Sequence, residues 1–152
     1  MIDLQYAKNT SVSSEMSKMN IERTLIRYEA DNFAYAMSPT KSMIMFSMHG
    51  KQVKFILPLP SMDEFRLTPT GRDRTAQSQR TEWEQACRQR WSALHLVVKA
   101  KLEAVECGIS VFEDEFMVNI VLPDGQTVSE FMLPQINQAY LTGKAPAMLL
   151  LE

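Results

Sequence analysis

The arginines between positions 66 and 90 are the residues whose type and spacing most clearly allow chemistry. Six fall in this stretch: Arg66, Arg72, Arg74, Arg80, Arg88 and Arg90. A guanidinium group forms bidentate hydrogen bonds with phosphate. An arginine-rich loop that leads into a helix can therefore bind a nucleic-acid backbone with salt-dependent, sequence-independent affinity. The pattern predicts these six residues as a binding site for nucleic acid or for a protein partner.

Helical pairing offers a second interpretation of the same charges. Three pairs of opposite charge are four residues apart, a spacing that lets side chains pair along a helix: Arg80 with Glu84, Glu84 with Arg88, and Lys99 with Glu103. On this interpretation the helix presents an ordinary solvated face. It does not account for Arg66, Arg72 and Arg74, which precede the expected helix.

Charge is segregated along the chain. The formal net charge of -2 is nearly neutral, which argues against a protein that simply coats DNA, since such proteins carry a large positive excess. Residues 66–101 have a balance of +5, whereas residues 102–152 have a balance of -7. This polarity can steer docking onto a complementary protein surface. It also allows head-to-tail or symmetric self-association.

Residue patterns for catalysis or metal binding are missing from the sequence. His49 and His95 have no Cys, Asp or Glu at ligand spacing on the same face, and no HExxH, CxxC, P-loop or dinucleotide fingerprint occurs. The carboxylates at 113–115 would point in different directions on a helix and so would not converge on a metal. Negative charge in the first turn of a helix stabilises the helix through its dipole. We expect no cofactor, no metal and no enzymatic activity.

The length and the cysteines favour one cytoplasmic domain. A chain of 152 residues suits a single domain. Cys87 and Cys107 fall in one expected helix, roughly 30 Å apart along its axis, which is too far for a disulfide and fits a reducing compartment. No secretory signal and no membrane-spanning apolar run is visible.

Hydrophobic periodicity predicts an α+β fold. We expect a flexible arm at 1–13, a helix at 14–28 and strands at 32–37, 41–48 and 52–57. Short links between the strands predict an antiparallel meander. The strand at 41–48 is apolar on both faces, which is typical of a central strand covered on both sides.

A long helix is expected at 77–107, after an irregular stretch at 58–76 that is either functional or disordered. Its apolar residues recur every three or four positions and should pack on the sheet: Trp83, Cys87, Trp91, Leu94, Val98, Leu102 and Val105. Both tryptophans are therefore interpreted as core residues rather than as platforms for stacking bases.

Two shorter helices are expected in the C-terminal part. Ser110 with Glu113 and Thr127 with Glu130 have the spacing of capping boxes. The first helix would reach Ile120, with a strand at 117–122 as the competing prediction. The second would end near Gly143, and the apolar tail from 145 to 151 is expected to pack down.

Four stretches of the sequence also resemble a known family. They are Ile21 to Tyr28, Val53 to Pro58, Glu84 to Glu106 and Ile120 to Gly125, of which the Cys-Arg-Gln-Arg-Trp run at 87–91 is the most specific. Together they resemble a family of uncharacterised small bacteriophage and prophage proteins over about residues 14–150. The resemblance implies a phage product made in the bacterial cytoplasm, and it implies no functional residue.

Three functions remain open from the sequence. The first is a nucleic-acid-binding accessory protein for phage DNA replication or recombination. The second is a protein-interaction module that inhibits a host defence complex. The third, an enzyme with an unfamiliar site, has no positive support in the residues.

Overall fold

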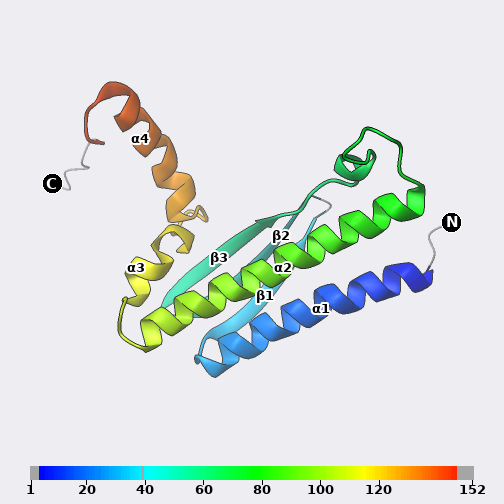
Figure 1. Ribbon diagram of the computed structural model, residues 1–152. Helices are drawn as coiled ribbons and strands as arrows, with labels where there is room; N and C mark the ends of the chain where they lie inside the picture. Colours follow the sequence, from blue (N-terminus) through cyan, green and yellow to red (C-terminus); the bar gives the residue numbers. More distant parts are fainter. Residues whose placement is uncertain (1–3, 39, 147–152) are drawn as a thin grey trace.

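The computed structural model describes residues 4–38 and 40–146, with side chains from residue 16 onward. It has an α+β architecture (Figure 1). The elements in chain order are α1 (Leu4–Arg27), β1 (Asp31–Met37), β2 (Lys41–Met48), β3 (Lys51–Pro58), η1 (Met62–Phe65), α2 (Ala76–Glu106), α3 (Phe112–Phe116), η2 (Met117–Asn119) and α4 (Val128–Thr142).

The three strands form an antiparallel meander in the order β1-β2-β3, which confirms the sheet expected from the short links. Ile44 at the middle of β2 lies opposite Tyr35 on one side and Phe55 on the other. The β2–β3 turn places His49 and Gly50 at positive φ angles of 52° and 75°. This backbone conformation is typical of tight hairpin turns.

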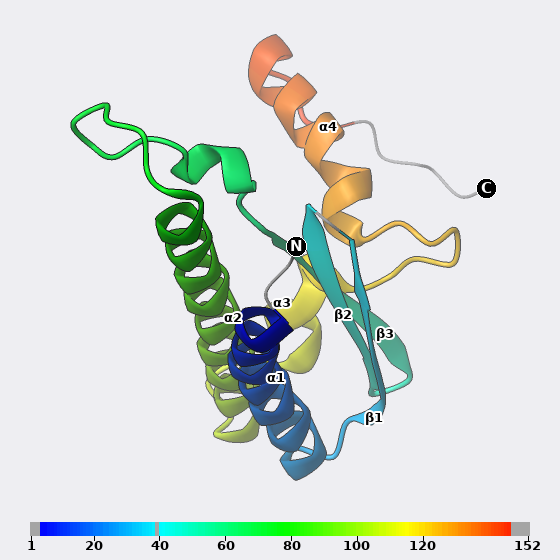
Figure 2. The same cartoon turned by 90° about the vertical axis from the view of Figure 1, so that its right-hand side faces the viewer.

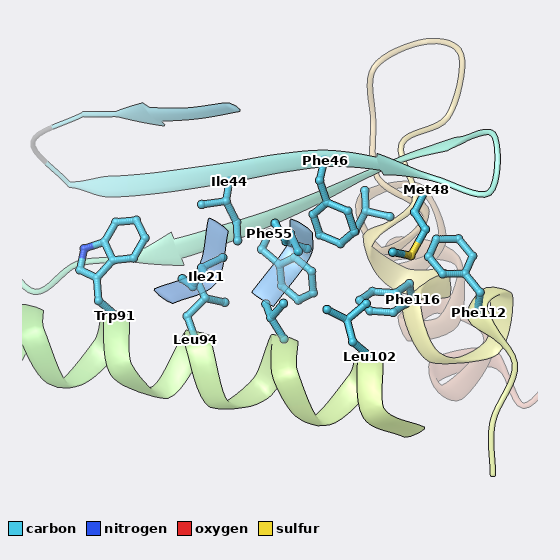
Figure 3. Packing of buried hydrophobic residues seen from close by; sticks show 13 residues of the cluster. Ile21, Ile44, Phe46, Met48, Phe55, Trp91, Leu94, Leu102, Phe112 and Phe116 are labelled. Carbon is cyan, nitrogen blue, oxygen red and sulfur yellow. The ribbon is translucent and has the colours of Figure 1, made fainter. Parts of the chain in front are cut away.

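Helices α1 and α2 run side by side in the same direction and cover one face of the sheet (Figures 1 and 2). The core lies between the two layers, where Trp91 and Leu102 of α2 face Ile44 and Phe46 of β2 (Figure 3). All four side chains are at least 98% buried. From Trp91 to Leu102, the apolar stripe of the long helix therefore packs on the sheet as expected.

The opposite face of the sheet carries no packed helix in the part of the chain that the structure describes (Figure 2). Met43 and Met45 of β2 are only half-buried there, whereas Ile44 and Phe46 on the helix side are buried. The expectation that this strand is covered on both sides is therefore wrong. Its central position in the sheet, between two partner strands, is as expected.

Two helix starts differ from the sequence pattern. Helix α1 takes in residues 4–13, which the pattern places in an N-terminal arm. Helix α3 starts after Val111, because Ser110 does not cap it and instead donates a hydrogen bond from its hydroxyl to the Val111 carbonyl at 3.3 Å. Beyond α3 the chain forms isolated bridges at 120–121, so part of the competing strand prediction holds.

Helix α4 projects from the rest of the molecule (Figure 1). It starts as expected, with the Thr127 hydroxyl accepting a hydrogen bond from the Glu130 amide at 3.1 Å. It ends as expected at Gly143, whose φ of 70° suits a glycine at a helix C-terminus. No residue of α4 is buried. Most of the apolar tail expected to pack down, from residue 147 on, lies outside the described residues.

Over the described ranges, no helix is both long and apolar enough to cross a bilayer.

Candidate nucleic-acid interface

The segment before α2 is an ordered hairpin rather than an irregular loop. Leu67 and Asp73 form an antiparallel bridge, and the Arg74 amide donates to the Arg66 carbonyl at 2.9 Å. Gly71 at the turn has a φ of 87°, a conformation that costs little only for glycine. The local hydrogen bonds therefore present residues 66–74, the arginine hairpin, as a projecting unit beyond the start of α2 (Figure 2).

Three long-range hydrogen bonds anchor the chain leading to this hairpin. The Trp83 indole donates to the Pro60 carbonyl at 2.7 Å, and the Gln79 amide donates to the Met62 carbonyl at 2.9 Å. Arg90 donates to the Pro58 carbonyl at 2.7 Å. The prediction that Trp83 belongs to the core is wrong, because its ring is half-buried and its polar atom holds this segment against α2. Trp91 confirms the same prediction, with 1% exposure.

The hairpin arginines have two different roles. Arg66 and Arg72 are exposed, and neither guanidinium has a hydrogen bond or ion pair to the described residues. Arg74 is half-buried and donates to the Phe65 carbonyl at 3.3 Å. We conclude that Arg74 stabilises the hairpin, whereas Arg66 and Arg72 are open to an external anion.

The arginines of α2 do not form one surface with each other. Arg80 is half-buried one turn inside the helix, next to the base of the hairpin. Arg88 and Arg90 are two residues apart and therefore point to different sides, about 200° around the axis. Because Arg90 donates to the Pro58 carbonyl and Arg74 to the Phe65 carbonyl, two of the six predicted residues support the fold. Arg66 and Arg72 are the two that the hairpin leaves open to an external anion.

A second basic surface lies in the groove between α1 and α2. The groove has a volume of about 210 Å³ and combines residues from both helices: Asn20, Arg23, Thr24, Arg27, Tyr28, His95 and Lys99. The sequence pattern did not single out Arg23 and Arg27. Their four-residue spacing puts them on one helix face, but only the packing of α1 against α2 brings them to Lys99, more than 70 positions later.

Hydrogen bonds across this groove fix its shape while leaving its cations available. Thr24 Oγ1 lies 3.1 Å from His95 Nε2, and the Tyr28 hydroxyl donates to Glu103. The bond to Glu103 raises the pKa of Tyr28 above its ordinary value. Glu103 is thus engaged by Tyr28 rather than by Lys99, contrary to the expected helical pairing. No hydrogen bond or ion pair within the described chain engages the charged groups of Arg23 and Lys99.

The two basic surfaces lie along the same long helix. Lys99 follows Ala76 by 23 positions, which corresponds to roughly 35 Å along the axis. That length is close to one turn of duplex DNA, about 34–36 Å. Arg88 lies between them and shares a helix face with Lys99, eleven residues on, since eleven residues make about three turns. The arrangement can contact successive phosphates of an extended nucleic acid.

The acidic cluster has a structural role. Glu113 pairs with Lys51 at 3.3 Å and Glu115 pairs with Lys101 at 3.4 Å, so the two carboxylates are held apart. The pKa of Glu113 is lowered mainly by a hydrogen bond that its carboxylate accepts from its own backbone amide, and next by the hydrogen bond from Lys51. Within the described ranges, no three potential ligands of the His, Cys, Asp or Glu type gather in a metal-binding group.

A larger cavity beside α4, of about 380 Å³, offers no catalytic constellation. Among the described residues its lining has one charged side chain, Lys144, beside polar and apolar residues such as Gln135, Gln138 and Pro146.

Comparison with protein-family models, with curated proteins and with solved structures finds no match to this chain. The interface is therefore interpreted from its own geometry.

Proposed function

We propose that this chain is a non-enzymatic nucleic-acid-binding protein that contacts the phosphate backbone, acting as an accessory factor in phage DNA replication or recombination. The observation that carries the proposal is the arginine hairpin, an ordered projection on which Arg66 and Arg72 are exposed and have no charged partner among the described residues. The groove cations Arg23 and Lys99 form the second basic surface, farther along α2.

Preorganisation makes the hairpin suited to this task. Its backbone is already fixed by hydrogen bonds between residues 66–68 and 71–74. Binding then costs less conformational entropy than it would from a disordered loop. Each arginine offers two parallel donors to a phosphate. Because the cationic side chains are spaced along α2, they favour an extended strand or duplex over a small anion.

The distribution of charge supports the same orientation. The acidic helix α3, with Glu113, Asp114 and Glu115 in its first turn, lies at the end of α2 opposite to the hairpin (Figure 1). A polyanion that approaches the hairpin would therefore meet positive charge at the end of α2 that is remote from this acidic cluster. Long-range attraction of this kind raises association rates and is screened by salt.

The test is fluorescence polarisation against labelled single- and double-stranded DNA and RNA at low salt. We expect Arg66→Ala/Arg72→Ala to weaken binding at least about tenfold, since two charge-assisted contacts are lost. Arg66→Lys/Arg72→Lys should retain part of the affinity, because charge remains while the bidentate geometry is lost.

Lys144→Ala provides a control at the far end of the molecule, with one positive charge removed from an exposed residue. It should bind as the unmodified chain does. The proposal is wrong if the unmodified chain shows no binding at low salt, or if the double alanine variant binds as tightly as the Lys144→Ala control.

A second function, inhibition of a host defence complex through a protein interface, is favoured by α4. Tyr140 and Leu141 on this projecting helix are 87% and 82% exposed, and exposed apolar surface of this kind often marks a protein-binding site. This function predicts no nucleic-acid affinity and a host partner that is retained by the unmodified chain but lost by Tyr140→Ser/Leu141→Ser. Equal retention by both chains would exclude α4 as the interface.

A further inference from the structure

The edge of the sheet at β1 is open to pairing. In the sheet order β1-β2-β3, strand β1 has β2 as its single neighbour. The other outer strand, β3, is partly covered, since Val53 forms a bridge with Ile120 and the Val121 amide donates to the Gln52 carbonyl at 2.8 Å. Nothing comparable covers β1 in the part of the chain that the structure describes. One row of its backbone hydrogen-bonding groups is thus unpaired.

The alternation of hydrogen bonds along the β1–β2 ladder identifies which backbone amides and carbonyls of β1 are unpaired. The Ser38 amide donates to the Lys41 carbonyl at 2.8 Å and closes the β1–β2 hairpin. Hydrogen-bonded and non-hydrogen-bonded pairs alternate along an antiparallel ladder. Ala36 and Ala34 therefore bond to β2, and the amides and carbonyls of Phe33, Tyr35 and Met37 point away from the sheet.

The exposed edge lacks the features by which proteins prevent such strands from associating. Edge strands are protected by charged side chains, proline or bulges, whereas residues 33–37 read Phe-Ala-Tyr-Ala-Met. The one irregularity lies outside this run, at Asn32, where φ is 49° and the register shifts. Tyr35 and Met37 are 49% and 60% exposed although both point to the helix side of the sheet.

We propose that two copies of this chain associate through β1, with the two strands antiparallel about a twofold axis at Tyr35. A second copy fits this edge because an antiparallel strand is complementary to itself, and because residues 33–37 carry no charge of their own. The cation beside them, Lys18 of α1, lies over the Tyr35 ring at 4.9 Å, on the helix side of the strand. In this register Tyr35 pairs with Tyr35, Phe33 with Met37 and Ala34 with Ala36. The result is one continuous six-stranded sheet.

The symmetry of this dimer has a consequence for the proposed interface. A twofold axis between antiparallel edges is perpendicular to the sheet, so it keeps both helix layers on the same face. The two α1–α2 grooves would then open on one side of the dimer. The dimer itself rests on the β1 edge alone and does not depend on nucleic-acid binding.

The test is sedimentation equilibrium of the full chain and of two paired variants, without nucleic acid. Ala34 and Ala36 are exposed and point to the uncovered face of the sheet, so charged replacements there should leave the fold intact, which circular dichroism checks. Ala34→Lys/Ala36→Lys places like charges opposite each other in both symmetry-related pairs. We expect its dimer dissociation constant to rise at least about tenfold, since each opposed pair disfavours the ladder.

Ala34→Lys/Ala36→Glu has the same two positions changed but opposes Lys to Glu across the axis, and it should dimerise about as well as the unmodified chain. Hydrogen exchange needs no variant and should show protection of residues 33–37 that rises with protein concentration. A monomer at high micromolar concentration, or a dimer that tolerates the two lysines, would overturn the proposal. The second outcome would move the interface elsewhere, for example to α4.

Discussion

Arginines of one sequence cluster perform different tasks, and local partners decide which. Arg66 and Arg72 are exposed on the hairpin without a partner among the described residues, whereas Arg90 donates to the Pro58 carbonyl at 2.7 Å. Sequence spacing placed them together as one site. It did not distinguish them, because the carbonyl that engages Arg90 lies 32 positions earlier in the chain.

The first residue-scale prediction separates the two kinds of arginine by stability. Arg90→Ala should lower the free energy of unfolding by about 1 kcal/mol, because the Pro58 carbonyl loses a hydrogen bond from the guanidinium group. Arg66→Ala should change it by less than about 0.5 kcal/mol, as expected for an exposed side chain away from structural contacts. Urea denaturation checks both. Equal losses in the two variants would contradict the assigned roles.

The second concerns the two cysteines, which are both free. Burial raises the pKa of the Cys87 thiol, so its reactive thiolate is scarce at neutral pH, whereas Cys107 is exposed. Iodoacetamide at pH 8 should modify Cys107 well before Cys87, as read by peptide mass spectrometry. In Cys107→Ser, fast modification should be absent until urea unfolds the chain; fast labelling of the folded variant would contradict this placement.

Elements whose boundaries depend on local spacing were predictable from the sequence. The three strands, their hairpin links, the long helix and the helix that ends at Gly143 all follow from periodicity and turn residues. The start of α3 was not predictable, because the Ser110 hydroxyl bonds to the Val111 carbonyl instead of capping the helix. The arginine hairpin was missed as well, since its order depends on backbone bonds that no side-chain pattern records.

The candidate site was predictable only in part, for a related reason. The arginines from 66 to 90 were identified from their clustering along the sequence. Arg23 and Arg27 became part of the surface only through the parallel packing of α1 on α2, a long-range contact without a sequence period. Likewise, Trp83 has the spacing of a core residue but lies near the helix start, beyond the end of the sheet, where it bonds to Pro60.

The element-scale prediction concerns the start of α2, which carries the hairpin. The Thr75 hydroxyl accepts a hydrogen bond from the Ser78 amide at 3.1 Å and caps the helix. Thr75→Ala should lower the free energy of unfolding by about 1 kcal/mol, whereas Thr75→Ser keeps the cap and should cost much less. Thermal and urea unfolding measure both variants. A Ser variant as unstable as the Ala variant would show that the cap is not what matters.

At the scale of the whole molecule, one aromatic cluster joins the C-terminal part to the sheet. Phe116 of α3 meets Phe46 and Phe55 edge-on, with ring centroids 5.9 and 6.2 Å apart (Figure 3). It is fully buried, whereas the adjacent Met117 is 47% exposed. This cluster fixes the base from which α4 projects.

Phe116→Ala should therefore lower the free energy of unfolding by about 3–5 kcal/mol, the usual cost of removing a buried aromatic ring. Met117→Ala, one position later, should cost well under half as much. Equilibrium urea denaturation followed by tryptophan fluorescence measures the difference, since Trp91 is in the same core. Similar losses for the two variants would contradict the burial that the structure shows.

The central claim is that phosphate contacts along α2 bind nucleic acid, and salt dependence tests it most directly. The measurement is the dissociation constant for a duplex at several salt concentrations, for the unmodified chain and for Arg66→Ala/Arg72→Ala. The logarithm of affinity should fall linearly with the logarithm of salt, with a slope of about -0.9 per phosphate contacted. The double variant should reduce the slope by about two. Affinity that is independent of salt, or an unchanged slope in the variant, would contradict the claim.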